Sequence, residues 1–290
     1  MYYLKGLENN INNIIAIAKR QNHDIQTLTD LKRGYLNAVS ELQQDVSYNK
    51  DCALAHFLAQ TPYYSEDLDE ILSLTRKYKD FSLLTDIQDV SDSMEAPKLT
   101  SIEKAKPAFV RAITQLKEFD EDLYGLMLLA VNTFFYCPAT NNLGGGSTSS
   151  AVGVIWCSYK QEWTTDDIIE FLVHELTHQL VFIDEIAIGH YYDMDALAEP
   201  RNFAISSILR KPRPLDKVIH ALIVANEIQK LRGILKLKGT ERAHPSSEIL
   251  RTSIPTSIDS ILSMNNIDQL IKPRVFELIE SIQVSNLEAA

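Results

Sequence analysis

The stretch TTDDIIEFLVHELTHQLVFIDEIAIG, residues 164–189, decides how this sequence is interpreted. Thr164 followed three residues later by Asp167 is close to a capping box, so a helix is predicted to begin here. Gly189 marks its predicted end. Apolar residues recur at helical spacing between these two points and predict a buried stripe; they are Ile168, Ile169, Leu172, Leu176, Leu180, Ile183 and Ile186.

This predicted helix carries the motif HELTH at residues 174–178, an HExxH pattern. His174 and His178 are four residues apart, so they lie on the same helix face, about one turn from each other. At that spacing two imidazoles can bind one divalent metal ion, and Glu175 can approach a water molecule or a substrate group beside it. The motif therefore predicts a metal centre. The alternative is an ordinary helix with two surface or hydrogen-bonded histidines.

A metal centre built on HExxH needs a third protein ligand, and four later residues are candidates. Asp184 has the spacing of one metalloprotease clan, but that clan has a glycine where Val181 stands here. A straight helix would also turn Asp184 away from the metal. His190 follows the predicted helix end and could bend back, or it could be an ordinary loop histidine.

The other two candidates lie further along the chain. Glu199 suits the protease clan whose third ligand is a glutamate on the next helix. His220 lies in LDKVIHALIVANEIQKLRGIL, residues 215–235, whose periodicity predicts a helix that is apolar on nearly all sides. A buried imidazole is costly without a partner, and a metal ion would be such a partner. Position alone favours His220, with Glu199 next.

Two segments together resemble a family of HExxH proteins encoded beside genes for ribosomally made, modified peptides. They are FLVHELTHQL (171–180) and SSILRKPRPLDKVIHALIVANEI (206–228), and the likeness covers roughly residues 125–235. The resemblance implies an iron(II)- and 2-oxoglutarate-dependent peptide β-hydroxylase that acts on a residue of a precursor peptide.

Carried over onto this sequence, the resemblance implies that His174, His178 and His220 are the metal ligands. Three imidazoles leave three positions open on a six-coordinate ion for 2-oxoglutarate and dioxygen. Arg213 would be the first candidate to bind the 2-oxoglutarate carboxylate and Arg210 the second, because a guanidinium matches a carboxylate with two parallel hydrogen bonds.

Without the resemblance, the motif most simply predicts a zinc metallopeptidase with Glu175 as the general base. In a hydroxylase Glu175 would have no hydrolytic role, and would orient a ligand histidine or the peptide. The substrate is a peptide in both cases. A non-catalytic peptide-binding module with a vestigial site is the third possibility, and it predicts no bound metal.

The rest of the sequence predicts an α+β protein that is predominantly helical. Residues 1–120 are expected to form a helical region that supports the catalytic part or binds peptide, and residues 121–290 the metal-binding catalytic domain. The segment 131–159 is predicted as a hairpin with a long glycine-rich crossover. It would give a small antiparallel sheet beside the buried motif helix, in a zincin-like core with helical regions at both ends.

Composition limits the partners and the location. Acidic residues outnumber basic ones, 39 to 28, for a formal charge of −11, which argues against nucleic acid or an anionic membrane as a partner. Three cysteines without a CxxC pair are consistent with a reducing compartment. No apolar stretch approaches the roughly 20 residues that cross a bilayer. We expect a cytoplasmic protein that could form a homodimer.

Overall fold

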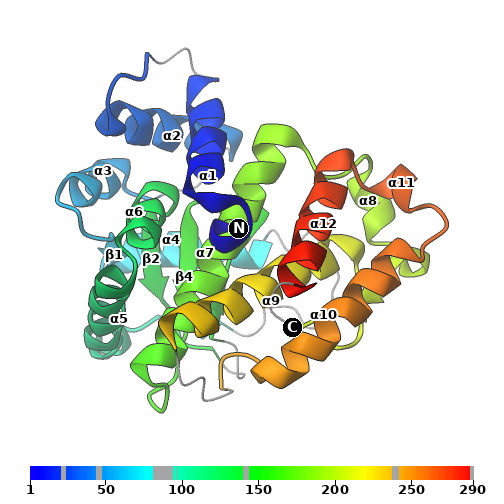
Figure 1. The fold of residues 1–290 in the computed structure, drawn as a ribbon. Helices are drawn as coiled ribbons and strands as arrows, with labels where there is room; N and C mark the ends of the chain where they lie inside the picture. The colour runs from blue at the N-terminus through cyan, green and yellow to red at the C-terminus, as the bar shows by residue number, and fades with distance from the viewer. Residues whose placement is uncertain are drawn as a thin grey trace.

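Helix α7 (Thr165–Ile188) runs through the middle of the molecule (Figure 1). The predicted capping box is present: the Thr164 hydroxyl accepts a hydrogen bond from the Asp167 amide, and the Asp167 carboxylate accepts one from the Thr164 amide. Most positions from Asp167 to Asp184 are buried, because α7 packs against helices on several sides. The helix ends at Gly189, whose φ is +89°.

The computed structural model describes residues 1–20, 24–43, 48–80, 94–95, 97–139, 144–236 and 242–287, which are predominantly helical. The other helices are α1 (Tyr2–Lys19), α2 (Leu28–Leu42), α3 (Lys50–Leu58), α4 (Leu68–Asp80), α5 (Leu99–Phe119), α6 (Glu121–Ala130), α8 (Met194–Leu197), α9 (Leu215–Leu235), α10 (Ser247–Leu262), α11 (Ile267–Leu270) and α12 (Pro273–Leu287), with 3-10 turns η2 (Ser149–Ala151) and η3 (Pro200–Asn202). The strands are β1 (Tyr64–Ser65), β2 (Thr133–Tyr136), β3 (Gly145–Gly146), β4 (Val154–Cys157), β5 (Ala204–Ile205) and β6 (Pro212–Arg213).

The main sheet is mixed, so the prediction of an antiparallel sheet was wrong. Its strand order is β1-β2-β4-β3; β2 runs parallel to both β1 and β4, and only β3 runs antiparallel to β4. The connection after β2 is long enough to bring the chain back to the same end of the sheet, so β2 and β4 are not a hairpin. Strand β4 instead forms its hairpin with the two glycines of β3. Strands β5 and β6 form a separate antiparallel ribbon.

Strands β3 and β4 lie directly beside α7. Gln179 of α7 holds the start of β4: its side-chain oxygen accepts from the Gly153 amide at 2.6 Å, and its side-chain nitrogen donates to the Val154 carbonyl at 2.8 Å. A Cβ atom on Gly145 would lie 2.0 Å from the Trp156 carbonyl oxygen. Only glycine therefore fits where β3 passes between the sheet and the motif helix.

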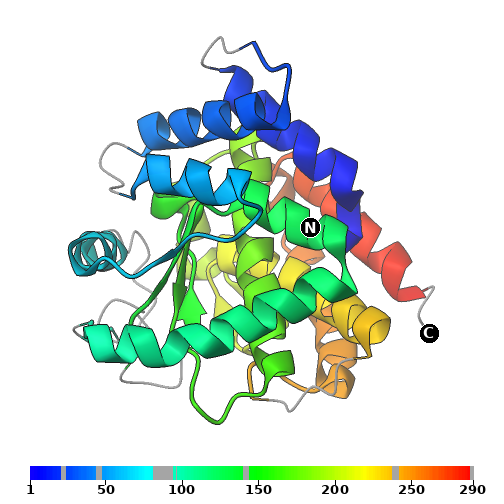
Figure 2. The ribbon, with the colours of Figure 1, turned by 90° about the vertical axis from the view of Figure 1, so that its left-hand side faces the viewer.

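The N-terminal helices pack onto the same core as the rest of the chain. One hydrophobic cluster draws on residues from both predicted regions. Helices α1 and α2 lie toward one end of α7 and α10 toward the other (Figure 2). Asp120 ends α5 and caps α6, so the predicted boundary at 120 falls between two consecutive helices. That boundary stays a prediction.

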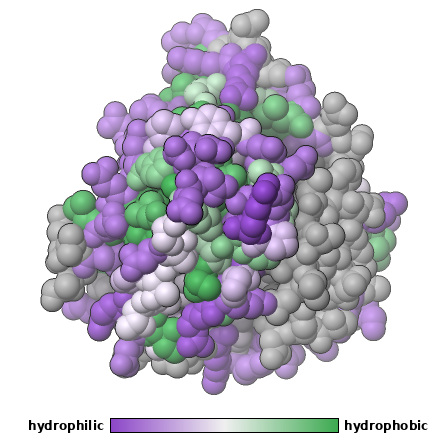
Figure 3. Space-filling view, turned by 90° about the vertical axis from the view of Figure 1, so that its right-hand side faces the viewer, coloured by the Kyte–Doolittle hydropathy of each residue, from purple (hydrophilic) through white to green (hydrophobic). Residues whose placement is uncertain are grey.

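The described part of the chain has no helix with the length and apolarity to cross a membrane. On the coloured part of the face that lies to the right in Figure 1, hydrophobic areas are separated by hydrophilic residues (Figure 3).

A buried lysine closes the C-terminal end of α6. Lys32 of α2 is 1% exposed, and its ammonium group lies 2.9 Å from the carbonyl oxygens of Leu128 and Leu129, 3.2 Å from that of Val131 and 2.9 Å from Oδ1 of Asn132. The negative end of the helix dipole lies here, which favours a cation. Burial nevertheless lowers the pKa of Lys32 to about 7.

We expect Lys32→Met to remove a pH dependence of stability. Between the folded pKa near 7 and the ordinary lysine value, the unfolded state binds more protons, so the free energy of unfolding of the wild type rises with pH. The wild type should therefore gain up to about 2 kcal/mol relative to the variant between pH 7.5 and 9. Urea unfolding at several pH values measures this. Lys50→Met, at an exposed position, is the control, and a difference independent of pH would contradict the prediction.

Candidate functional site

Four histidines form a row across α7. His174 and His178 face each other with their Nε2 atoms 3.0 Å apart. Beyond His178, its Nδ1 lies 3.1 Å from Nδ1 of His220 on α9. Beyond His174, its Nδ1 lies 2.5 Å from Nε2 of His244, which precedes α10. The structure therefore brings the three predicted ligands together and adds His244, which the sequence did not indicate.

Burial keeps the imidazoles of His174, His178 and His220 neutral. It lowers the pKa of His174, His178 and His220 well below the ordinary histidine value. The ammonium of Lys217, one turn before His220, adds to this effect at His220. Neutral imidazole is the form that binds a metal ion.

The protons of the row can be assigned by counting, because each neutral imidazole has one donor and one acceptor nitrogen. The Glu170 carboxylate can only accept, so Nδ1 of His244 donates to it at 2.8 Å. Nε2 of His244 then accepts from Nδ1 of His174, which leaves a lone pair on Nε2 of His174. His178 donates its Nε2 proton to that lone pair and accepts from His220 through Nδ1. Each of the four rings thus has at least one hydrogen-bond partner.

Glu175 lies beside the row with one oxygen unused. Its Oε1 is 3.8 Å from Nε2 of His174, and its Oε2 is buried without a hydrogen-bond partner among the described residues. Burial raises the pKa of Glu175 to about 8. The hydroxyl of Ser147, just after β3, donates to the Glu175 backbone carbonyl at 3.4 Å. A buried carboxyl oxygen without a hydrogen bond lowers the stability of the fold unless another group contacts it. Its presence here is consistent with a site for water, an ion or substrate.

The histidine pair fits one metal ion. With bonds of 2.0–2.1 Å, two adjacent nitrogen ligands of a six-coordinate ion lie about 3 Å apart, which is the separation of His174 and His178. His220 meets the other ring nitrogen of His178, and in the described ranges no three histidine, cysteine or carboxylate side chains converge on one point. In the His178 ring, Cε1 lies between the two nitrogens and so points between His174 and His220. A half-turn about the Cβ–Cγ bond exchanges Cε1 with Nε2, which would then point between those two residues.

Asp184 and His190 belong to a different buried cluster. Oδ2 of Asp184 lies 2.7 Å from Nε2 of His190, and Arg274 of α12 binds both Asp184 oxygens at 2.7 and 3.0 Å. Asn13 of α1 donates to the same carboxylate at 2.7 Å. These contacts join α1, α7 and α12, and they occupy both side chains as structural groups.

The remaining predicted residues lie on the chain between α7 and α9. Glu199 is 44% exposed and pairs with Arg201 at 2.5 Å. Arg213 is half-buried on β6, two residues before α9 begins, and Arg210 is exposed in the turn between β5 and β6 with φ of +53°. Both arginines therefore lie on the segment that leads into the helix of His220.

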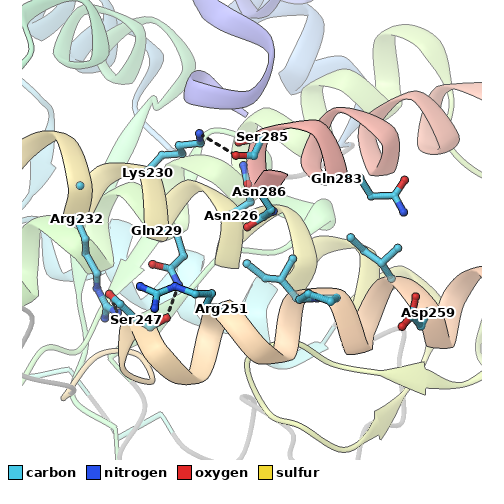
Figure 4. Close-up of a pocket in the computed structure, with 14 residues that line it drawn as sticks. Asn226, Gln229, Lys230, Arg232, Ser247, Arg251, Asp259, Gln283, Ser285 and Asn286 are labelled. Carbon is cyan, nitrogen blue, oxygen red and sulfur yellow. Dashed lines mark hydrogen bonds between the residues drawn. The ribbon is translucent and has the colours of Figure 1, made fainter. Parts of the chain in front are cut away.

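Glu170 is held in turn by Arg232 of α9. The guanidinium binds both carboxylate oxygens at 2.7 Å and also donates to the Pro245 carbonyl at 2.8 Å. Burial alone would raise the pKa of Glu170, but hydrogen bonds from His244 and Arg232 outweigh it and hold that pKa below its ordinary value. Arg232 also lines a pocket of about 730 Å³ between α9, α10 and α12, with Asp259 at the opposite end (Figure 4).

No family model matches this sequence, and a comparison with curated proteins finds none that is similar. The assignment of a function therefore depends on the site itself.

Proposed function

We propose that this chain is a metal-dependent enzyme that modifies a peptide, with His174, His178 and His220 as the metal ligands. The observation that carries the proposal is the pair of facing Nε2 atoms 3.0 Å apart on a buried helix, with His220 beside the second ring. All-imidazole donor sets suit iron, zinc, copper and nickel. The placement of strand β4 beside the motif helix supports a zincin-like core.

The leading activity is iron(II)- and 2-oxoglutarate-dependent β-hydroxylation of a residue in a ribosomally made precursor peptide. The bound ion with 2-oxoglutarate and dioxygen would supply oxidation of an unactivated carbon, with succinate and carbon dioxide as by-products. Three imidazoles from this chain leave room for such a cosubstrate. The RPL segment before His220 also supports the proposal, because its Arg213 is a cation that could bind the cosubstrate carboxylate.

Three cations near the entry of α9 could bind the cosubstrate carboxylate. Arg213 remains the first candidate and Arg210 the second. Lys217 is a third, because its charge acts on both His178 and His220. Its ammonium lies 3.5 Å from Oδ2 of Asp216, so the charge is shared with a neighbour on the same turn. Lys217 was not among the candidates predicted from the sequence, although its position three residues before His220 on the predicted helix could have indicated it.

The peptide would bind at the edge of the sheet. Strand β4 pairs on both sides, with β2 and β3, so it has no free edge. Strand β3 is the edge strand of this sheet on the side of α7, and an extended peptide would pair along it. Pairing there would place the peptide beside Glu175, since the loop after β3 contacts the backbone of that residue.

A zinc metallopeptidase is the second candidate, and one observation favours it. The Oε2 of Glu175 is buried without a hydrogen-bond partner among the described residues, and in the ionised form of the carboxyl it is suited to accept the proton of an attacking water molecule. In the hydroxylase the same oxygen would contact the peptide or orient a ligand.

Turnover assays separate the two activities. Protein loaded anaerobically with iron(II) is expected to convert 2-oxoglutarate to succinate once oxygen is admitted, and to show a visible charge-transfer band before that. Cleavage of a mixed peptide digest with zinc, without loss of 2-oxoglutarate, would replace the hydroxylase by the peptidase. Absence of both activities and of metal retention would leave a non-catalytic binding module.

Glu175→Gln is expected to keep metal affinity within about threefold while changing turnover. Removal of a general base should slow peptide cleavage by about 100- to 10,000-fold in a peptidase. Consumption of 2-oxoglutarate should fall less, because no proton transfer by Glu175 is needed. Initial rates measure both, with Glu162→Gln at an exposed position as the matched control. Equal loss of both activities and of the metal would contradict the assignment.

A further inference from the structure

We propose that His244, Glu170 and Arg232 form a positioning relay that fixes the ring orientation and tautomer of His174. The three residues come from the segment before α10, from α7 and from α9. They form a chain of contacts that starts at Nδ1 of His174. The effect of this relay on metal affinity rests on the proposed function, whereas its hydrogen bonds are independent of that function.

The relay begins with a rigid ion pair. Arg232 and Glu170 are joined by two parallel hydrogen bonds of 2.7 Å, and their side chains are only 7% and 4% exposed. A buried guanidinium and carboxylate joined in this way have a fixed relative geometry and no net charge. The third contact of Arg232, to the Pro245 carbonyl, holds the residue that directly follows His244.

The ion pair fixes the direction of the hydrogen bonds. Because the Glu170 carboxylate has only acceptors, a neutral His244 must donate through Nδ1 and accept through Nε2. His174 must then carry its proton on Nδ1. Its Nε2 is left with a lone pair, and that lone pair points at His178. The relay therefore presents the nitrogen that a metal ion needs.

His174 differs from His178 in this respect. Among the described residues, Nδ1 of His178 contacts His220, which is itself a proposed ligand and whose ring also neighbours Phe182. The outer nitrogen of His174 instead meets a chain that ends in a fixed ion pair. Partners of this kind behind a ligand histidine typically contribute 10–100-fold to metal affinity. His244 is thus a positioning residue, and it does not itself hold the ion.

Two substitutions at His244 test the relay. The side-chain oxygen of His244→Gln can lie near the position of Nε2 and accept from His174, whereas His244→Leu removes the acceptor. Long-range ¹H–¹⁵N spectra of protein without added metal should show His174 as the Nδ1–H tautomer in the wild type and in the glutamine variant, and as a mixture in the leucine variant. Cobalt(II) affinity should fall about 10–100-fold in His244→Leu and stay within about threefold in His244→Gln.

The outcomes distinguish the relay from the proposed function. Cobalt affinity of His244→Leu within threefold of the wild type, or a His174 ring protonated at Nε2 in the wild type, would overturn the relay. The expected tautomers in a wild-type protein that binds no cobalt would support the hydrogen-bond relay and overturn the metal-dependent function. If the leucine variant does not fold, His244→Asn replaces it: its amide reaches Glu170 but not His174, so the same loss is expected.

Discussion

His178→Ala is expected to abolish metal binding, with an affinity for cobalt(II) at least about a thousandfold below that of the wild type. His178 is the ring that contacts both other proposed ligands, His174 at 3.0 Å and His220 at 3.1 Å. Its removal deletes a ligand and leaves the remaining two separated, which should exceed the 10–100-fold effect of losing a supporting partner. Competition with a chelator, followed by the visible absorption of bound cobalt, measures the affinity.

The same measurement decides the third ligand. His220→Ala should weaken cobalt binding strongly, and Glu199→Ala should not, because Glu199 is half-exposed and pairs with Arg201. His56→Ala, which removes a histidine that hydrogen-bonds Thr61 at the end of α3, is the control. Full affinity in the His178 variant would end the proposal of a metal centre at this motif. Full affinity in the His220 variant alone would move the third ligand to Glu199.

Asp184→Ala is expected to lower the free energy of unfolding by about 3–5 kcal/mol, the usual effect of removing one partner from a buried ion pair. Asp184 is completely buried, and the substitution leaves Arg274, His190 and Asn13 without their common acceptor. Burial alone would raise the pKa of Asp184, but His190 and Arg274 outweigh it and hold that pKa well below the ordinary aspartate value. Urea unfolding at neutral pH measures the change.

Glu199→Ala is the matched control for stability as well. It breaks an exposed ion pair, which should change the free energy of unfolding by less than about 1 kcal/mol. An equally small effect of Asp184→Ala would contradict the role given to the buried cluster. Loss of cobalt affinity in a folded Asp184 variant would instead show that this carboxylate acts at the metal centre.

The helices were predictable because their signals are local. The capping box of Thr164 and Asp167 is present, and the predicted range 215–235 is the range of α9. Each of these signals lies within about one helix turn of the residues whose conformation it predicts. The position of His178 relative to His174 follows from the same short-range geometry.

The direction of the strands could not be predicted from the same signals. Two apolar, β-branched segments separated by a glycine-rich stretch are compatible with a hairpin and with a parallel pair. The outcome depends on β3, a two-residue strand of glycines whose sequence contains no strand signal, and on Gln179, which holds β4 from another element. Neither contact lies within a single helix turn or strand, so local sequence signals do not show it.

The site was predictable in part. His220 lies beside the motif pair as its buried position indicated, although it meets His178 through Nδ1. His244 lies outside any periodic segment, so nothing in the sequence connects it with His174. One signal was available: Glu170 is four residues before His174 and so lies on the same helix face. A buried acid at that position predicts a partner, but the identity of the partner depends on where α9 and the segment before α10 pass.

The hydrogen-bonded row of histidines also bears on the order in which the chain would fold and bind the proposed metal ion. Since each ring has a hydrogen-bond partner within the row, the core can form with these side chains in place before the proposed ion binds. Binding of that ion would then require a shift of protons among the histidines and a half-turn of the His178 ring. Removal of the proposed ion with a chelator should accordingly inactivate the protein reversibly without unfolding it. Small domains in which the metal itself drives folding would instead unfold.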